Sequence, residues 1–252
     1  MKVSIVIIVK NGAKTLGKCL DSLHTFDDIV IYNNGSSDET ASIASKYTNV
    51  QLIEGKFIGF GPTKNIAATY AKHNWILSLD SDEVMNERIV QEISTLEYNP
   101  KTVYSILRKN FYQATEIRHC WGTDEVVRIY HRGITQYSCD YVHEHVLSDG
   151  LKIVKLQNSF SHFPYQNIVD FMIKANYYST LFATNHVGKK SSSPSKALFN
   201  SLYSFFRTYI LKRGFLDGHA GLVIAFSHMT TNFYKYMKLY EMNLKHNSDF
   251  RS

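Results

Sequence analysis

Residues 75–83 read Trp-Ile-Leu-Ser-Leu-Asp-Ser-Asp-Glu, and this stretch indicates both a fold and a site. The mostly apolar run 75–79 is typical of a buried strand. It ends at Asp80 and Asp82, two carboxylates one residue apart. In open α/β sheets, ligands bind beyond the carboxyl ends of the strands. The stretch therefore predicts a polar site at the end of a buried parallel strand.

Strand and helix signals alternate on the N-terminal side of this stretch. Apolar, β-rich runs occupy residues 3–9, 28–32 and 50–53, and helical spacing of apolar residues occupies 15–23, 38–46 and 62–73. Repeated β-α-β units imply a parallel sheet covered by helices. We therefore expect the α/β class, with a Rossmann-like, mostly parallel sheet and helices on both faces.

The pattern changes after residue 100. Short β-like stretches occupy 102–108, 126–130 and 151–156, and from residue 164 onward apolar residues recur with helical spacing. Ser193 and Pro194 are typical of a helix start, because serine caps free N–H groups and proline suits the first turn. We predict a sheet domain over 1–160, with halves that meet near residue 100, and a helical C-terminal region over 161–252.

The composition is that of a well-packed globular protein, because 44% of the 252 residues are hydrophobic. The three cysteines form no CxxC pair, which favours free thiols in a reducing compartment. The first apolar run is too short for a signal peptide. No uncharged apolar stretch reaches about 18 residues, so we expect no membrane-spanning helix.

The positive charge is concentrated toward the C-terminus. Residues 1–150 carry 15 Lys and Arg against 18 Asp and Glu, whereas residues 151–252 carry 13 against 4. Such a segment is attracted to anionic lipid, nucleic acid or a phosphorylated substrate. No nucleic-acid-binding signature accompanies it, so we expect no nucleic acid partner. The apolar stripes of its helices either pack on the sheet domain or lie at a membrane surface.

The paired carboxylates of residues 80–82 suit a divalent cation. Mg²⁺ and Mn²⁺ prefer oxygen ligands, and Mg²⁺ commonly bridges one or two carboxylates to phosphates. Such a cation neutralises charge on a departing nucleotide diphosphate. A solvated acidic loop is the alternative, but the position after an apolar strand in the fourth βα unit favours a site.

Two further polar segments follow strands of the same sheet. In residues 29–40, a strand leads through Asn33, Gly35 and Ser36 into a helix start, whose free N–H groups can bind phosphate. Residues 59–65 place Lys64 behind two glycines that permit close approach to a ligand. For residues 29–40, the alternative is an ordinary Asn-Gly turn without a ligand. For residues 59–65, it is a loop that only leads into a helix.

In sequence order, these pieces resemble the family 2 inverting glycosyltransferases of the GT-A fold. The shared pieces are the first strand ending near Lys10-Asn11, the turn 34–40, Lys64-Asn65 and Asp80-Ser81-Asp82. Within that family the chain is similar to the lipopolysaccharide- and lipooligosaccharide-core β-1,4-glucosyltransferases. The segments that carry this likeness span nearly the whole chain: 59–65, 77–83, 121–132, 142–144 and 209–218.

The resemblance implies roles for individual residues. Asp80 and Ser81 would lie at the ribose and diphosphate of a nucleotide sugar, and Asp82 would bind Mg²⁺ or Mn²⁺ together with His143. The donor would also contact two cationic residues, Lys64 and Arg128. At the strand ends it would contact Val9, Asn11, Asn33, Gly35 and Ser36. Asn33 replaces an aspartate that reads the base in many relatives, although an amide can still bond a pyrimidine. Gly12 stands where a glutamate is usual.

Inversion requires a general base that takes the proton of the acceptor hydroxyl. The resemblance points to Asp124, in the segment Trp121–Glu125. Glu125 and Glu144 are alternatives for this role. A structural ion pair between Asp124 and Arg128, four residues later, is the non-catalytic interpretation.

The reaction implied is transfer of a hexose, glucose from UDP-glucose, to a lipid-linked core oligosaccharide such as the inner-core heptose of lipopolysaccharide. The enzyme would be cytoplasmic and bound peripherally to the inner face of the bacterial inner membrane, with an anionic membrane surface as partner. Two other classes stay open: a metal-dependent nucleotidyltransferase, and a catalytically inactive nucleotide-sugar- or glycan-binding protein.

Overall fold

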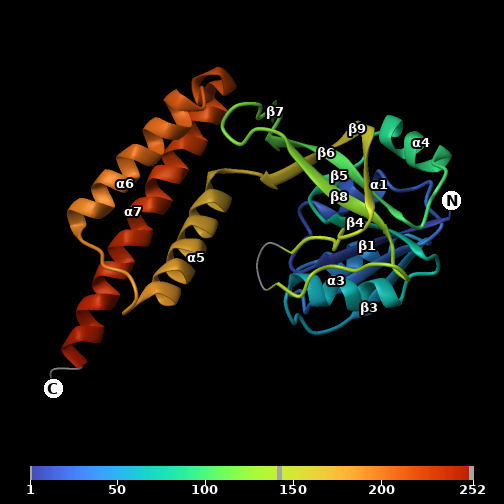
Figure 1. Ribbon diagram of the computed structural model, residues 1–252, viewed down its shortest axis with the longest axis horizontal. Helices are drawn as coiled ribbons and strands as arrows, with labels where there is room; N and C mark the ends of the chain where they lie inside the picture. The colour runs from blue at the N-terminus through green and yellow to red at the C-terminus, as the bar shows by residue number, and fades with distance from the viewer. Residues whose placement is uncertain (1, 141–143, 250–252) are drawn as a thin grey trace. The chain divides into compact units, whose positions relative to one another are not determined.

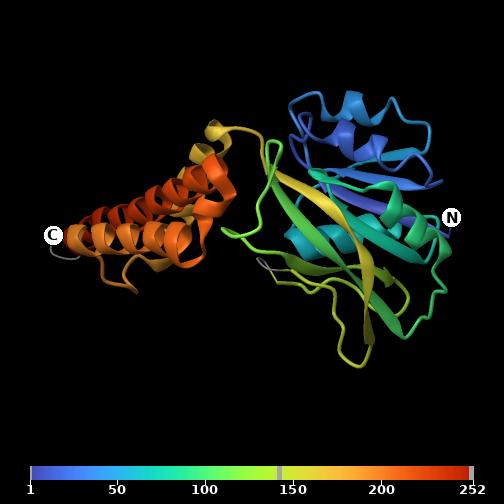
Figure 2. The same ribbon diagram turned by 90° about the horizontal axis from the view of Figure 1, so that it is seen from above.

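The computed structural model describes residues 2–140 and 144–249. The chain divides into two compact units, Met1–Lys109 with Thr123–Phe163, and Asn110–Gly122 with Pro164–Ser252. The first unit holds most of the sheet and the second holds the long helices (Figure 1, Figure 2). Residues 110–122 group with the helices, although the sequence analysis placed them in the sheet domain.

The sheet is mixed, and its strands run in the order β3-β2-β1-β4-β8-β6-β9-β5, with β7 paired to β6. Its strands are β1 (Val3–Val9), β2 (Ile29–Asn33), β3 (Val50–Glu54), β4 (Trp75–Asp80), β5 (Glu83–Val84), β6 (Thr102–Tyr112), β7 (Thr115–Glu116), β8 (Asp124–His131) and β9 (Lys152–Tyr165). The first four strands pair in parallel, whereas β8 is antiparallel to both β4 and β6. The predicted α/β class is therefore confirmed, with a parallel half followed by an antiparallel half.

Helices cover both faces of the parallel half (Figure 1). They are α1 (Leu16–Asp21), α2 (Thr40–Ala44), α3 (Phe60–Thr69) and α4 (Glu87–Thr95). Ile5 and Ile7 of β1 share one core with α1, α2 and α4, while Val6 and Ile8 share another with α3. Successive residues of a strand point to opposite faces. This two-sided burial explains why six of the seven residues of β1 are apolar.

The parallel register brings the polar strand ends together. Val9 at the end of β1 pairs with Asn33 at the end of β2, and Ile8 pairs with Asp80 at the end of β4. These residues belong to the parallel strands, so their carboxyl ends meet at one edge of the sheet. Three of the predicted site positions thus lie next to one another.

The helical unit consists of α5 (Ile168–His186), α6 (Pro194–Phe206), the π-turn Arg207–Leu211, the 3₁₀-turn Gly214–Asp217, and α7 (Gly218–Asp249). α7 packs against both α5 and α6 (Figure 1). The Ser193 side chain accepts a hydrogen bond from the Lys196 N–H at 3.1 Å, with Pro194 in the first turn, so the predicted helix start is confirmed. Over the described residues, we find no helix with the length and apolarity needed to cross a membrane.

Candidate active site

The paired carboxylates lie where a central strand ends. Asp80 is the last residue of β4, between β1 and β8, and Asp82 lies in the turn that leads to β5. Both side chains are partly exposed, whereas Glu83 is fully buried. The Asp80 N–H donates to Glu83 Oε2 at 3.0 Å, which closes the turn. The site therefore offers two accessible carboxylates on a fixed turn.

Two buried cations flank Asp80. Lys64 Nζ lies 3.2 Å from Asp80 Oδ1, and Arg128 Nη2 lies 3.0 Å from Asp80 Oδ2. Burial alone raises the pKa of Asp80, but Lys64 and Arg128 outweigh it and hold this pKa well below its usual range. Asp80 is thus fully ionised at neutral pH.

The same cations bind further acids. Lys64 Nζ lies 3.0 Å from Glu144 Oε1, and Arg128 bonds Glu83. Burial lowers the pKa of Lys64, but Asp80 and Glu144 raise it above its usual range. In this structure Lys64 and Arg128 therefore hold carboxylates in place, and their contact with a donor phosphate stays a prediction.

Two charged residues of the site, Glu83 and Arg108, were not predicted from the sequence. Glu83 is the fourth residue of Asp-Ser-Asp-Glu, and its burial raises the pKa of its carboxyl despite the charge of Arg128. Arg108 of β6 lies 3.6 Å from Glu83 and 2.9 Å from Asp124. Its position depends on the pairing of β6 with β8, which no local sequence pattern reveals.

Asp82 lies next to a histidine of β9. His162 Nε2 is 3.6 Å from Asp82 Oδ2, because Glu83 and His162 are paired across β5 and β9. A carboxylate oxygen is a suitable ligand for both Mn²⁺ and Mg²⁺. An imidazole nitrogen is a suitable ligand for Mn²⁺. Within 2–140 and 144–249, no group of three or more His, Cys, Asp or Glu side chains is arranged to hold a metal. The predicted ligand His143 lies outside the described residues.

The candidate bases occupy different surroundings. Asp124 begins β8 and accepts a 2.9 Å bond from Arg108, not from Arg128 as the non-catalytic interpretation required. Glu125 bonds Ser105 and Lys155, and Glu144 bonds Lys64. Nearly half of the Asp124 side chain is exposed, which leaves it accessible to a substrate.

The ends of β1 and β2 form a hydrogen-bonded wall. Asn33 is buried, donates to Glu54 at 2.8 Å and accepts from the Ser36 N–H at 3.1 Å. Ser36 Oγ accepts from the Asn11 N–H at 2.9 Å. Gly35 has a φ of 77°, which glycine adopts without strain. This wall fixes the backbone at the predicted nucleotide site, with the Asn33 amide bonded to protein partners.

Gly12 has a steric role. A Cβ built at this position would lie 2.5 Å from Val9 Cγ2 and 3.2 Å from Ser81 Oγ. Residues after β1 and β4 therefore approach closely, and a larger residue at position 12 would push them apart. The structure thus explains why a glycine stands here.

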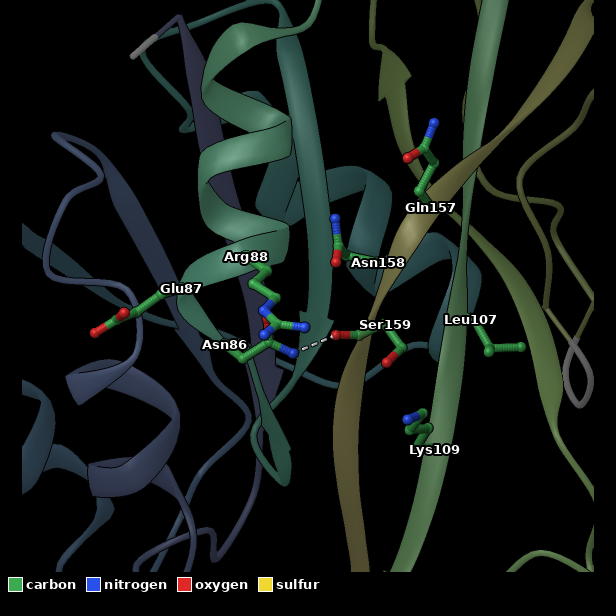
Figure 3. A pocket seen from close by; sticks show the side chains of 8 residues that line it. All are labelled: Asn86, Glu87, Arg88, Leu107, Lys109, Gln157, Asn158 and Ser159. Atoms are coloured by element: carbon green, nitrogen blue, oxygen red, sulfur yellow. Dashed lines mark hydrogen bonds between the residues drawn. The ribbon is translucent and has the colours of Figure 1, made fainter.

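Two polar cavities lie in the sheet unit. One, of about 390 Å³, is lined by Lys64, Asp80, Arg108, Glu125, Val126, Val127, Arg128, Tyr137, Glu144, His145, Val146 and Ser148. The other, of about 650 Å³, is lined by Asn86, Glu87, Arg88, Leu107, Lys109, Gln157, Asn158 and Ser159 (Figure 3). In the second, Asn86 donates to the Ser159 carbonyl at 2.6 Å, and Glu87 points away from Arg88 and Asn158.

Comparison with known proteins identifies the family. The model of the family described as "Glycosyl transferase family 2" matches residues 4–156, which include Asp80, Asp82 and all of β8. The chain belongs to glycosyl transferase family 2. The predicted family, its GT-A fold class and the assignment as a glycosyltransferase are thereby confirmed.

Relatives in this family cover nearly the whole chain. An uncharacterised glycosyltransferase of Rickettsia bellii is 25% identical over 100% of this chain and 90% of its own length. The lipopolysaccharide core biosynthesis glycosyltransferase LpsC of Rhizobium meliloti is 25% identical over 90% of both chains. A crystal structure of S. aureus TarS with UDP-GlcNAc is 13% identical over 99% of this chain and 92% of that chain, with a TM-score of 0.46.

Proposed function

We propose that this glycosyltransferase transfers a hexose, glucose from UDP-glucose, with inversion to a lipid-linked core oligosaccharide such as the inner-core heptose of lipopolysaccharide. The observation that carries the proposal is the pair Asp80 and Asp82 at the end of β4, within a family 2 domain. Similarity to a lipopolysaccharide core enzyme over 90% of both chains supports the acceptor class. With such an acceptor, the enzyme would act at the cytoplasmic face of the inner membrane.

The donor would lie across the ends of β1, β2 and β4. Asp82 would hold Mg²⁺ or Mn²⁺, with His162 as a further ligand for Mn²⁺, and the metal would neutralise charge on the leaving nucleoside diphosphate. Asp80, fixed by Lys64 and Arg128, would accept hydrogen bonds from the ribose hydroxyls. The backbone wall at Asn33 and Ser36 would position the base.

Asp124 would act as the general base. It would accept the proton of the acceptor hydroxyl as the hydroxyl oxygen attacks the anomeric carbon and the bond to the diphosphate breaks. Its 2.9 Å bond from Arg108 orients the carboxylate, and nearly half of its side chain is exposed to solvent. The 650 Å³ cavity would hold further sugars of the acceptor, because amide and guanidinium groups suit sugar hydroxyls and phosphates.

The test is nucleotide release by the purified full chain with UDP-glucose and Mn²⁺. We expect UDP to be released, and Asp82→Asn to abolish this release, while Glu97→Gln, an exposed acid outside the site, leaves it unchanged. Release of pyrophosphate from a nucleoside triphosphate would instead identify a nucleotidyltransferase. Donor binding without any release would identify an inactive binding protein. The glycan of a deletion strain, analysed by mass spectrometry, tests the acceptor.

A further inference from the structure

In α5 and α6, most of the buried side chains are small, and many large apolar side chains face outward. In α6, Ala197 and Ser201 are buried, whereas Phe199 is 72% exposed. In α5, where Phe171 is also buried, Ala175 is buried and Met172 is 66% exposed. A helix in water normally turns its large apolar face inward. Small residues at helix contacts are typical of helices that lipid surrounds.

These outward side chains form a concentrated surface. Of the 27 exposed large hydrophobic residues found in the described part of the chain, 20 lie in the helical unit. Phe199, Leu202 and Phe206 recur at intervals of three and four residues, so they share one face of α6. An apolar surface of this kind on one unit marks an interaction site. We name Phe199, Leu202 and Phe206 the α6 face.

Positive charge accompanies the α6 face. Residues 189–213 contain six Lys and Arg and no Asp or Glu. Arg207, Lys212 and Arg213, which follow α6, are all exposed. Each cation near an anionic lipid surface contributes about 1 kcal/mol of attraction. The chemistry of this segment thus matches a negatively charged bilayer with an apolar interior.

We propose that the α6 face inserts into the interfacial layer of an anionic membrane, while Arg207 and Arg213 bind lipid phosphates. The proposal deepens the proposed function, which requires a lipid-linked acceptor, and it names the surface that meets the membrane. A second copy of the chain is a poorer occupant, because a two-fold contact through this face would bring identical cationic segments together. An anionic bilayer satisfies both the apolar and the charged part of the surface.

The test measures binding of the full chain to vesicles of phosphatidylcholine with and without phosphatidylglycerol. The variant combines Phe199→Ser and Phe206→Ser. Its matched control combines Ile134→Ser and Ile153→Ser, which are 53% and 51% exposed in the sheet unit. We expect the vesicle affinity of the α6 variant to fall about 100-fold, because two phenyl groups are no longer transferred from water into the bilayer. The control should bind as the native chain does.

The charged residues are tested separately. Arg207→Gln with Arg213→Gln should weaken binding to phosphatidylglycerol vesicles by roughly 25-fold and leave the weak binding to phosphatidylcholine alone unchanged. Circular dichroism confirms that each variant is folded. UDP release in vesicle-free solution, measured on the same samples, should be equal in all of them.

Three outcomes would contradict the docking proposal. Failure of the native chain to bind any vesicle overturns it, as does equal binding by the α6 variant. Light scattering that shows a native dimer and a monomeric α6 variant, without vesicle binding, would make this face a contact between copies. Vesicle binding without UDP release would refute the proposed function alone, whereas UDP release without vesicle binding would refute the docking alone.

Discussion

Asp124 of β8 and Arg108 of β6 face each other across an antiparallel ladder, and their side chains form a 2.9 Å ion pair. The alternative partner, Arg128, is four residues from Asp124. That spacing brings side chains together on a helix, but a strand separates them by about 13 Å. Arg128 instead reaches Asp80 and Glu83. The extended conformation of residues 124–131 thus determines that Asp124 pairs with Arg108 and not with Arg128.

Asp124→Asn should remove the general base and leave the fold intact. We expect turnover to fall by about 10²- to 10⁴-fold with the donor affinity unchanged, because the amide cannot take the proton. The free energy of unfolding should change by less than about 1 kcal/mol, since the ion pair is half exposed. Glu125→Gln, on the same strand, is the control. A loss of turnover in the control, with Asp124→Asn still active, would instead assign the base to Glu125.

Asp80 and Asp82 should respond differently to the same substitution. Asp80→Asn leaves Lys64 and Arg128 with one acidic partner fewer. It should therefore cost about 1 to 3 kcal/mol of stability, less than a fully enclosed pair would lose, because a third of the Asp80 side chain is exposed. Asp82→Asn should change stability by under about 0.5 kcal/mol and abolish the Mn²⁺ dependence of donor binding. Urea unfolding and calorimetric donor titration check both, and equal stability losses would refute this division.

The parallel half of the fold could be predicted from local patterns. Residues 3–9 and 75–80 are apolar runs with polar ends, and chain order alone places such runs in one parallel sheet. Their polar ends then meet at one edge, so hydrophobic periodicity and the βα order together predict a site that includes Asn33 and Asp80. Val9 was assigned to the site from the family resemblance alone.

The antiparallel half could not be predicted in the same way. β9 extends over Lys152–Tyr165, whereas its apolar pattern ends at Leu156, so His162 was not recognised as a strand residue beside Asp82. Arg108 and Glu83 meet through strand pairings between segments far apart in the chain. Long-range register depends on packing rather than on local spacing. The sequence therefore identified Asp80 and Asp82, but not Glu83, Arg108 or His162 beside them.

Arg88 provides a test of the 650 Å³ cavity as an acceptor site. It is exposed on α4 and lies beside Asn158 and Ser159 of β9 (Figure 3). Arg88→Ala should raise the acceptor KM about 10-fold, because one charge-assisted hydrogen bond is lost, and should leave kcat and the donor KM unchanged. Arg118→Ala, another exposed arginine, is the control. An unchanged acceptor KM for Arg88→Ala would show that this cavity does not bind the acceptor.

Asp217 should be a stabilising residue of the helical unit. Its carboxylate accepts hydrogen bonds from the N–H groups of Arg118, His119 and Cys120 at 3.1, 3.1 and 2.9 Å, and from His119 Nδ1 at 2.8 Å. Asp217→Ala leaves these donors without their acceptor and should cost about 2 to 4 kcal/mol. Asp217→Asn retains part of the bonding and should cost less. Equal, negligible losses in urea unfolding would contradict this role.

His228 should make the stability of the helical unit dependent on pH. It lies 3.1 Å from Thr208 Oγ1 and 3.5 Å from Trp121 Nε1. Burial, together with the charges of Lys212, Lys235 and Arg207, lowers the pKa of His228 to about 4 from the ordinary 6.5. The folded chain therefore keeps this imidazole neutral at a pH where the unfolded chain already binds a proton.

The direction of the effect follows from that difference. As the pH falls from 6.5 toward 4, the unfolded state binds one more proton than the folded state, so stability decreases, by up to about 3 kcal/mol in total. Above pH 6.5 both states are neutral at this residue and the effect disappears. His228→Gln keeps hydrogen-bonding capacity without a titrating group, so its free energy of unfolding should fall less steeply over the same range. Identical pH profiles for the native chain and His228→Gln would show that another group controls the acid sensitivity.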